Sequence, residues 1–323
     1  MRSILLNYIF LFTLTFSGLS QSHTEHFEGD YFSNLRFAHR GGYANGPENT
    51  ISTILGSIQR GNHALEIDVQ LTKDGHLVLF HDGSTERLLA TDRSMNIADL
   101  TLDEFVRLPM RDKSQGVQYP CSLGQLLDTL ILFTEKDQSF DFLLEIDFKP
   151  HGEQAKIGVD ALFRELEKRQ GALNGKLSEY FFVSTFYPDV LKEIYDRNTD
   201  VRTAFAVNSS PNESKFMAKI AVLLAPYFVK KYEVSIFEPN MCLITKRYVR
   251  KWQRKGILIN TYTANAQCEK QYLEQFDIAY TSNCPLELSC AGDPSDEPGK
   301  AVKWCKTCRK KKCQNRKSKN CRQ

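Results

Sequence analysis

The sequence predicts a protein of the α/β class whose parallel strands close into a (β/α)8 barrel. Short apolar segments rich in β-branched or aromatic residues alternate with amphipathic segments along the body of the chain. This alternation is typical of a parallel sheet, and seven or eight such units favour a barrel. The 323 residues accommodate one barrel of roughly 250 residues. An open doubly wound sheet is the alternative, but no G-x-G-x-x-G sequence follows a predicted strand.

The expected elements follow from where these segments begin and end. Strands are expected at 35–38, 64–69, 77–80, 142–148, 181–184, 201–207, 234–237, 257–262 and 278–281. Helices are expected at 50–59, 123–133, 153–170, 188–197, 214–224, 245–255 and 269–275. Asn49 or Thr50 is expected to cap the first of these helices, because both side chains accept hydrogen bonds from backbone N–H groups. Residues 82–119 form a polar excursion with a helical turn near 102–108.

The first 20 residues have the pattern of a secretory signal peptide. Arg2 precedes an apolar segment at 4–16, and small residues follow at 17–20. The apolar segment is too short to span a bilayer, and no later segment reaches the roughly 18 apolar residues of a transmembrane helix. We therefore expect a secreted, extracellular protein whose mature chain begins near Gln21.

Nine cysteines agree with an oxidising compartment, and six of them follow residue 283. We expect disulfide bonds in this C-terminal part, and an odd total leaves one thiol free or intermolecular. Buried thiols are the alternative for several of the nine. A zinc site built on Cys305 and Cys308 is disfavoured, because the later spacing matches no common zinc pattern and no histidine follows.

Residues 289–323 form a basic, cysteine-rich tail that follows a body expected to span 35–288. From Lys300 to Gln323 the tail has eleven Lys or Arg residues and no acidic residue. Such a tail suits an anionic membrane, a heparin-like polysaccharide or an acidic matrix, and a solvated tail is the alternative. No nucleic-acid partner is expected. Asn208 and Asn212 begin glycosylation sequons in a turn-rich segment.

Two pairs of acidic residues lie on predicted strands. Glu66 and Asp68 are two residues apart, so both point to the same face of their strand. Two such carboxylates repel each other unless a cation or a proton lies between them, and oxygen ligands suit Ca²⁺ or Mg²⁺. Glu145 and Asp147 form a second pair just before Lys149. Carboxylates from the ends of different strands are typical of a site at the C-terminal face of a barrel.

Two histidines end strands in the same part of the chain. One of His39 and His81 can take a proton from a nucleophile while the other protonates a leaving oxygen. Arg40 and Lys149 add fixed positive charge suited to a phosphoryl oxygen. A cation, two histidines and basic residues together favour cleavage of a phosphodiester.

These residues resemble the glycerophosphodiester phosphodiesterase family. The similarity spans about residues 35–288 and does not include the tail. It is carried by His39-Arg40-Gly41-Gly42, Pro47-Glu48-Asn49-Thr50, Glu66-Ile67-Asp68-Val69, Asp74-Gly75 and His81-Asp82. Weaker similarity continues through residues 96–101, 184–186, 262–265 and 281–283. The resemblance implies a TIM barrel that hydrolyses glycerophosphodiesters to glycerol phosphate and an alcohol with a divalent cation.

The resemblance also implies roles for individual residues. His39 and His81 become the acid–base pair, Arg40 a phosphate ligand, and Glu66 and Asp68 metal ligands. Whether the nucleophile is water or a hydroxyl of the substrate stays open.

The third metal ligand is less directly implied, because the family usually has Glu-x-Lys where this chain has Glu145-Ile146-Asp147-Phe148-Lys149. Alignment on Lys149 selects Asp147, and Glu145 is the alternative. Both point to one face, so strand geometry leaves the choice open. Tyr262 stands where the family commonly has Trp, which keeps an aromatic wall beside the substrate and adds a hydroxyl.

Two alternative functions remain. A lysophospholipase D or phospholipase D-like enzyme would act on membrane lipids, and the basic tail would hold it at an anionic surface. An inactive protein that binds matrix or heparin through its tail is disfavoured, because such a barrel has no chemical need for His39, His81, Glu66 and Asp68 together.

Overall fold

The computed structural model describes residues 27–136, 141–208 and 215–287. Eight parallel strands close into a barrel, because β1 pairs with both β2 and β9. β3 pairs antiparallel with β2 and lies outside the closed ring. The strands are β1 (Arg36–Ala38), β2 (Ala64–Leu71), β3 (Leu77–Leu79), β4 (Leu143–Phe148), β5 (Phe181–Thr185), β6 (Arg202–Val207), β7 (Ile236–Pro239), β8 (Leu258–Thr261) and β9 (Ala279–Ser282). The predicted (β/α)8 TIM barrel is confirmed, and the open sheet is wrong.

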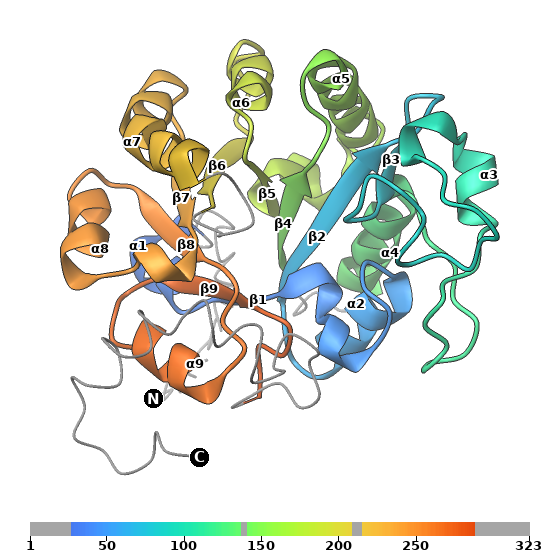
Figure 1. Ribbon diagram of the computed structural model, residues 1–323, viewed down its shortest axis with the longest axis horizontal. Helices are drawn as coiled ribbons and strands as arrows, with labels where there is room; N and C mark the ends of the chain where they lie inside the picture. The colour runs from blue at the N-terminus through green and yellow to red at the C-terminus, as the bar shows by residue number, and fades with distance from the viewer. Residues whose placement is uncertain (1–26, 137–140, 209–214, 288–323) are drawn as a thin grey trace, which may run out of the picture.

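The helices lie around the outside of the strands, as Figure 1 shows for α5 to α8. The α-helices are α1 (Gly29–Ser33), α2 (Ile51–Gln59), α3 (Leu102–Val106), α4 (Leu123–Lys136), α5 (Glu153–Glu167), α6 (Pro188–Tyr195), α7 (Lys215–Lys231), α8 (Lys246–Gln253) and α9 (Gln267–Leu273). Thr50 caps α2, and its hydroxyl oxygen accepts a hydrogen bond from the Thr53 N–H. Each helix that the sequence predicts is therefore present.

Alternation along β2 separates side chains that face the surrounding helices from side chains that face the interior of the barrel. On β2, Leu65, Ile67 and Val69 are buried in the core beneath the helices, whereas Glu66 and Asp68 point the other way and are also buried. The amino-terminal end of the barrel is closed by α1, whose Phe32 packs among the first residues of several strands. The carboxyl ends of the strands are therefore the end at which polar side chains gather.

Two elements differ from their sequence predictions. The helix expected to end at residue 224 continues as α7 to Lys231, through Pro226. Burial of Ala225 and Val229 in the core stabilises this extension against the missing N–H of the proline. The short α1 was not expected, because five residues are too few to show a helical period.

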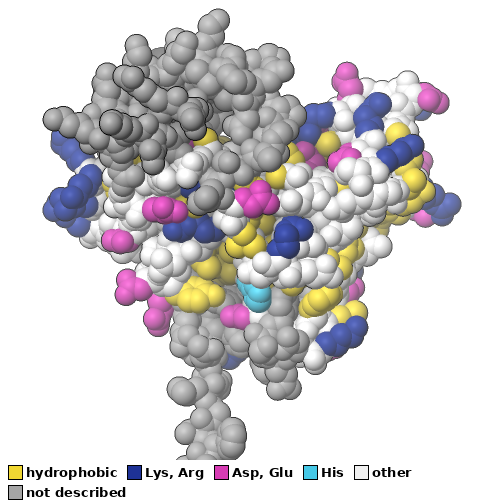
Figure 2. All heavy atoms as spheres, turned by 90° about the horizontal axis from the view of Figure 1, so that it is seen from below, with side chains coloured by type: hydrophobic (Ala, Val, Ile, Leu, Met, Phe, Trp, Pro, Cys, Tyr) yellow, Lys and Arg dark blue, Asp and Glu magenta, His cyan; other side chains and the backbone are white. Residues whose placement is uncertain are grey.

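Several predictions fall on residues that the structure does not describe. The signal peptide (1–20), the tail (289–323) and Asn212 lie outside the described residues, whereas Asn208 lies inside them. Among the described residues, no helix has the length and apolar character to cross a membrane. On the face shown in Figure 2, acidic and basic side chains lie scattered among apolar ones.

Candidate active site

The same tripeptide, Glu-Ile-Asp, occurs on two neighbouring strands of the barrel. Parallel pairing of β2 with β4 sets Glu66 beside Glu145 and Asp68 beside Asp147. The intervening isoleucines point outward into the apolar core, so all four carboxylates face the interior of the barrel. The alternation that the sequence predicts therefore places both acidic pairs at one site.

Three of these four carboxylates converge. One oxygen from each of Glu66, Asp68 and Asp147 lies within 4.8 Å of the other two. Glu145 instead accepts a hydrogen bond of 2.8 Å from Asn260 Nδ2 and lies in a buried cluster with Glu238. Of the two residues that the sequence left as alternatives, the structure groups Asp147 with Glu66 and Asp68.

Charge is distributed unevenly in this cluster. Burial and the nearby carboxylates of Asp68 and Asp147 raise the pKa of Glu66. Burial also raises the pKa of Asp147, more than the ion pair with Lys149 lowers it. For Asp68, burial acts in the same direction, but Lys149 and Arg40 outweigh it and lower the pKa. Of the three carboxyl groups, only Asp68 therefore has a pKa below its ordinary value, whereas the pKa values of Glu66 and Asp147 lie above theirs.

The turn after β1 brings Arg40 next to this cluster. Its backbone N–H donates a 2.6 Å hydrogen bond to Glu66 Oε2, and its Nε lies 3.5 Å from Asp68 Oδ2. Arg40, Gly41 and Gly42 all have positive φ angles, of 52°, 81° and 86°. A Cβ on Gly41 would lie 2.6 Å from Ile54 Cγ1, so the glycine is needed for the close approach of this turn to α2.

His39 is held by the segment that follows β9. Its Nδ1 lies 2.7 Å from Asn283 Oδ1, and Asn283 Nδ2 donates a 2.8 Å hydrogen bond to the Tyr43 hydroxyl. Because an amide oxygen only accepts, Nδ1 carries the proton and Nε2 keeps its lone pair. Burial and the neighbouring Arg40 lower the pKa of His39 to about 3, so it is neutral at pH 7.

His81, which follows β3, has a different environment. Its Nδ1 lies 2.6 Å from Asp82 Oδ1, and this carboxylate also receives hydrogen bonds from Arg87. Those partners lower the pKa of Asp82, although burial acts in the opposite direction. The Asp82 carboxylate accepts a hydrogen bond from His81 Nδ1 and so orients the imidazole ring. The two histidines therefore face partners of opposite kind: a neutral amide for His39 and a carboxylate for His81.

Further residues line the same site. Asn49 exchanges two hydrogen bonds with Asp68, of 2.9 Å from its Nδ2 to Oδ2 and 3.1 Å to its Oδ1 from the Asp68 N–H. Lys149 Nζ lies 2.8 Å from Asp68 Oδ1 and 5.9 Å from the centre of the Phe186 ring. Tyr262 packs edge-on against that ring at 5.9 Å. The predicted residues Lys149 and Tyr262 are thus joined through Phe186, which sequence reasoning did not select.

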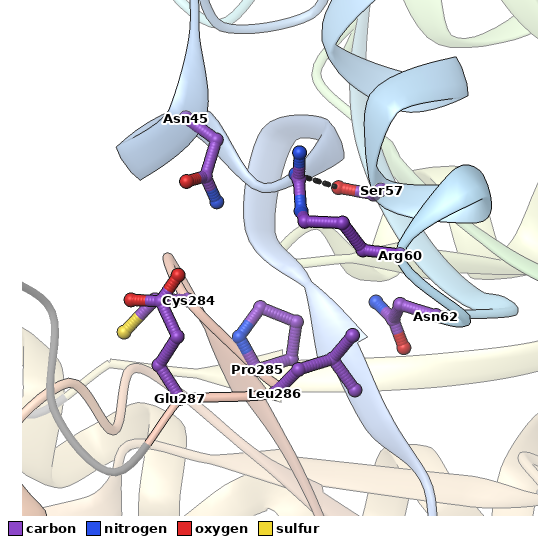
Figure 3. Close-up of a pocket in the computed structure, with 8 residues that line it drawn as sticks. All are labelled: Asn45, Ser57, Arg60, Asn62, Cys284, Pro285, Leu286 and Glu287. Atoms are coloured by element: carbon purple, nitrogen blue, oxygen red, sulfur yellow. Dashed lines mark hydrogen bonds between the residues drawn. The ribbon is translucent and has the colours of Figure 1, made fainter.

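A separate cavity of about 270 Å³ lies between α2 and the segment after β9 (Figure 3). Arg60 and Ser57 line it on the helix side, and Pro285 and Leu286 line it on the other. Arg60 Nη2 donates a 3.3 Å hydrogen bond to the Ser57 hydroxyl. Its lining includes none of the predicted site residues, so the acidic cluster and this cavity are distinct features.

Sequence reasoning assigned no role to Arg87, Asn283 or Glu238. Asn283 lies in a recognised motif, but only the fold brings it to His39, 244 residues away in sequence. Arg87 lies in the polar excursion, where no periodic pattern marks it. A charged residue on a buried strand was the available signal for Glu238 on β7.

Carboxylates, histidines and basic side chains at the carboxyl ends of the strands are typical of a barrel enzyme. The model of the glycerophosphoryl diester phosphodiesterase family matches residues 39–279. The chain therefore belongs to this family of phosphodiester hydrolases.

Known proteins agree with this assignment. Glycerophosphodiester phosphodiesterase 1 of Rattus norvegicus is 26% identical over 277 residues, which cover 79% of this chain and 78% of the relative. The fold is shared with an Oleispira antarctica phosphodiesterase solved with its product sn-glycerol-3-phosphate, at a TM-score of 0.60 and 19% identity over 78% of this chain and 93% of the other. A glycerophosphodiester phosphodiesterase of Parabacteroides distasonis has a TM-score of 0.59 at 19% identity, over 79% and 94%.

Proposed function

We propose that this enzyme hydrolyses glycerophosphodiesters to glycerol phosphate and an alcohol, with one divalent cation held by Glu66, Asp68 and Asp147. The observation that carries the proposal is the convergence of these three carboxylates beside Arg40. The rat relative is named a glycerophosphodiester phosphodiesterase, and the Oleispira structure contains sn-glycerol-3-phosphate. These names support the substrate class proposed for this chain.

The residues present fit a hard cation such as Ca²⁺ or Mg²⁺. All three donors are carboxylate oxygens, the ligands that both ions prefer. Asp147 Oδ1 is buried and has no hydrogen-bond partner among the described residues, so this oxygen could coordinate a cation. When bound, the cation supplies positive charge that offsets the charge on the phosphoryl oxygens.

We assign the base to His39 and the acid to His81. The neutral His39 has a lone pair on Nε2 and can take a proton from the attacking hydroxyl, which belongs to water or to the glycerol of the substrate. His81, paired with the Asp82 carboxylate, can hold a proton and give it to the leaving alkoxide. The opposite environments of the two imidazoles support opposite roles.

Arg40 and Lys149 bind the phosphodiester in this proposal. Arg40 is fixed by Glu48 and Glu66 and keeps its guanidinium at the acidic cluster. Lys149 follows β4 and lies at the same cluster. Cations placed before the reaction starts stabilise charge on phosphoryl oxygens at little reorganisation cost. Phe186 lies beside Lys149, and Tyr262 packs against Phe186, so the two rings form an aromatic wall in this proposal.

We also propose that the enzyme is secreted, that residues 1–20 are removed, and that Asn208 and Asn212 are glycosylated. Disulfide bonds are proposed for the C-terminal cysteines, and the state of Cys284, which is disulfide-bonded, supports this. Secretion is testable by sequencing the N-terminus of protein collected from the medium of expressing cells. A start near Gln21 is expected, and an N-terminus at Met1 contradicts the proposal.

A lysophospholipid is the second candidate substrate. The observation that favours it is the basic tail, with eleven Lys or Arg residues after residue 299. Deletion of residues 300–323 is expected to reduce activity on anionic vesicles that contain lysophospholipid, with activity on soluble glycerophosphocholine unchanged. Equal activity of both forms on the vesicles removes the membrane role of the tail from the proposal.

The proposed reaction is tested by product analysis with and without cation. Phosphorus NMR of glycerophosphocholine hydrolysis is expected to show glycerol phosphate, directly or through a cyclic phosphate. Chelation is expected to abolish turnover, and add-back of Ca²⁺ or Mg²⁺ is expected to restore it. Glu66→Ala and His39→Ala are each expected to reduce kcat by at least about a hundredfold. Full activity of either variant contradicts the site assignment.

A further inference from the structure

We propose that Arg87 is a positioning residue that sets two groups of the reaction at once: His81 through Asp82, and Arg40 through Glu48. The inference rests on the proposed roles of His81 and Arg40. Arg87 belongs to the polar excursion that follows β3, and it is not itself expected to contact the substrate. It acts on the reaction through the two carboxylates that it binds.

Arg87 donates four hydrogen bonds to two carboxylates, Glu48 and Asp82. Its Nη1 and Nη2 each donate a 2.8 Å hydrogen bond to one oxygen of Glu48. Its Nε and Nη2 donate bonds of 2.7 and 2.9 Å to the two oxygens of Asp82. The guanidinium therefore binds both oxygens of two carboxylates, an arrangement that fits the fork of arginine and not the single ammonium of lysine.

Each of these carboxylates also contacts a residue of the proposed active site. Asp82 Oδ1 lies 2.6 Å from His81 Nδ1. Glu48 also accepts bonds of 3.0 and 3.1 Å from Arg40 Nη1. Arg87 thus lies at the centre of a continuous chain of charged groups from the proposed acid to the phosphate-binding arginine. Its two ends, His81 and Arg40, follow β3 and β1, which both pair with β2, and Arg87 adds a direct side-chain link between the two segments.

Loss of Arg87 would change the charge balance around both Glu48 and Asp82. Glu48 is shared by two arginines, and its side chain is only 5% exposed. With Arg87 removed, Glu48 has Arg40 as its remaining cation and holds it more strongly, away from a phosphoryl oxygen. Asp82 likewise loses the two bonds that fix its plane, so it can turn away from His81. We therefore expect one substitution to weaken both phosphate binding and protonation of the leaving group.

The test compares two substrates that differ in their leaving group. Glycerophosphocholine loses an alkoxide, which needs a proton, whereas the 4-nitrophenyl ester of glycerol phosphate loses a phenolate, which does not. For Arg87→Gln we expect kcat on glycerophosphocholine to fall by about tenfold or more, with kcat on the nitrophenyl ester nearly unchanged. KM is expected to rise several-fold for both substrates, through Arg40.

Companion variants separate the two routes. Asp82→Asn is expected to reproduce the kcat effect, and Glu48→Gln the KM effect. Arg87→Lys is expected to behave like Arg87→Gln, since one ammonium does not bind four oxygens, and it keeps the charge that favours folding. Added guanidinium is expected to restore part of the activity of Arg87→Ala. The matched control is Arg107→Gln, because Arg107 is exposed and pairs only with Asp103 in the part of the chain that the structure describes.

The outcomes distinguish the inference from the proposed function. If His81→Ala loses activity equally on both substrates, the role of His81 as the acid is wrong. If His81→Ala discriminates between leaving groups and Arg87→Gln does not, the acid stands and the positioning role of Arg87 through Asp82 is overturned. An Arg87→Gln variant with unchanged kcat and KM on both substrates also overturns the inference.

Discussion

Asp68 on β2 and Asp147 on β4 are direct register partners, and the Nζ of Lys149 lies between them, 2.8 Å from the first and 2.5 Å from the second. Two adjacent buried carboxylates repel each other, so this pair needs positive charge. Lysine supplies one charge, while Glu66 adds a third carboxylate within reach. A divalent cation would balance the remaining negative charge, so we place the proposed metal site at Asp68 and Asp147.

Asp147→Asn is expected to weaken binding of the cation by about tenfold or more, because it removes one of three charged ligands. Glu145→Gln is the matched control, since Glu145 is bonded to Asn260 and lies outside the converging cluster. Calorimetric titration of each variant with Ca²⁺ and with Mg²⁺ measures the difference. A larger loss in Glu145→Gln than in Asp147→Asn assigns the third ligand to Glu145 instead.

The sequence predicts most of the residues that gather at this cluster, but not all of them. A two-residue spacing predicts that Glu66 and Asp68 share a face, and the strand pattern predicts where they lie in the barrel. The choice between Glu145 and Asp147 depends on how far one strand is shifted along the next, which spacing within a strand does not contain. Arg87 was missed for a related reason, because its partners are brought to it by loops.

The free energy of unfolding of the cation-free protein is expected to fall as the pH rises from about 5 to about 8. Burial raises the pKa of Glu238 to about 7, against roughly 4.3 in an unfolded chain. Between these values the native state binds more protons than the unfolded state, so stability decreases with pH. The loss is on the order of 3 kcal/mol for this residue.

Urea unfolding with chelator at pH 5, 6.5 and 8 measures this dependence. Glu238→Gln keeps the side-chain volume and removes the titrating group, so the stability of this variant is expected to vary less over the same pH range.

Burial raises the pKa of Glu66 and Asp147 as well, so cation binding releases protons. The stabilisation by Ca²⁺ is therefore expected to be larger at pH 8 than at pH 5, and the reverse order contradicts the prediction.

Asn283→Asp is expected to shift the acidic limb of the pH–rate profile toward higher pH by about one unit or more. A carboxylate in place of the amide favours the charged form of His39, whose pKa is lowered to about 3 by burial and by Arg40. His39 then becomes protonated at a higher pH, so its activity as a base falls off earlier as the pH is lowered. Tyr43→Phe is the control, because it removes the hydroxyl bonded to Asn283 without adding charge. A limb that moves equally in both variants rules out the charge effect.

The fold was predicted more completely than the site because its signals are local. Each strand of the barrel contains β-branched or aromatic residues bounded by polar segments, and this pattern needs no knowledge of the partner strand. One helix is an exception, because Pro226 predicts the end of a helix, yet α7 continues past it to Lys231. Val229 and Tyr232 pack into the core beyond the proline, and tertiary burial there outweighs the local preference.

Gly41→Ala is expected to destabilise the protein by about 3 kcal/mol and to reduce kcat. The added methyl would meet Ile54 Cγ1 at 2.6 Å, in a residue whose φ is 81°. The turn then shifts, and with it the backbone N–H by which Arg40 binds Glu66. Gly61→Ala isolates the backbone contribution: its φ is 87°, but no atom lies within 4 Å of the new methyl, so about 1 kcal/mol is expected. Urea unfolding and steady-state kinetics of both variants measure the difference, and equal losses of stability show that the contact with α2 does not constrain the turn.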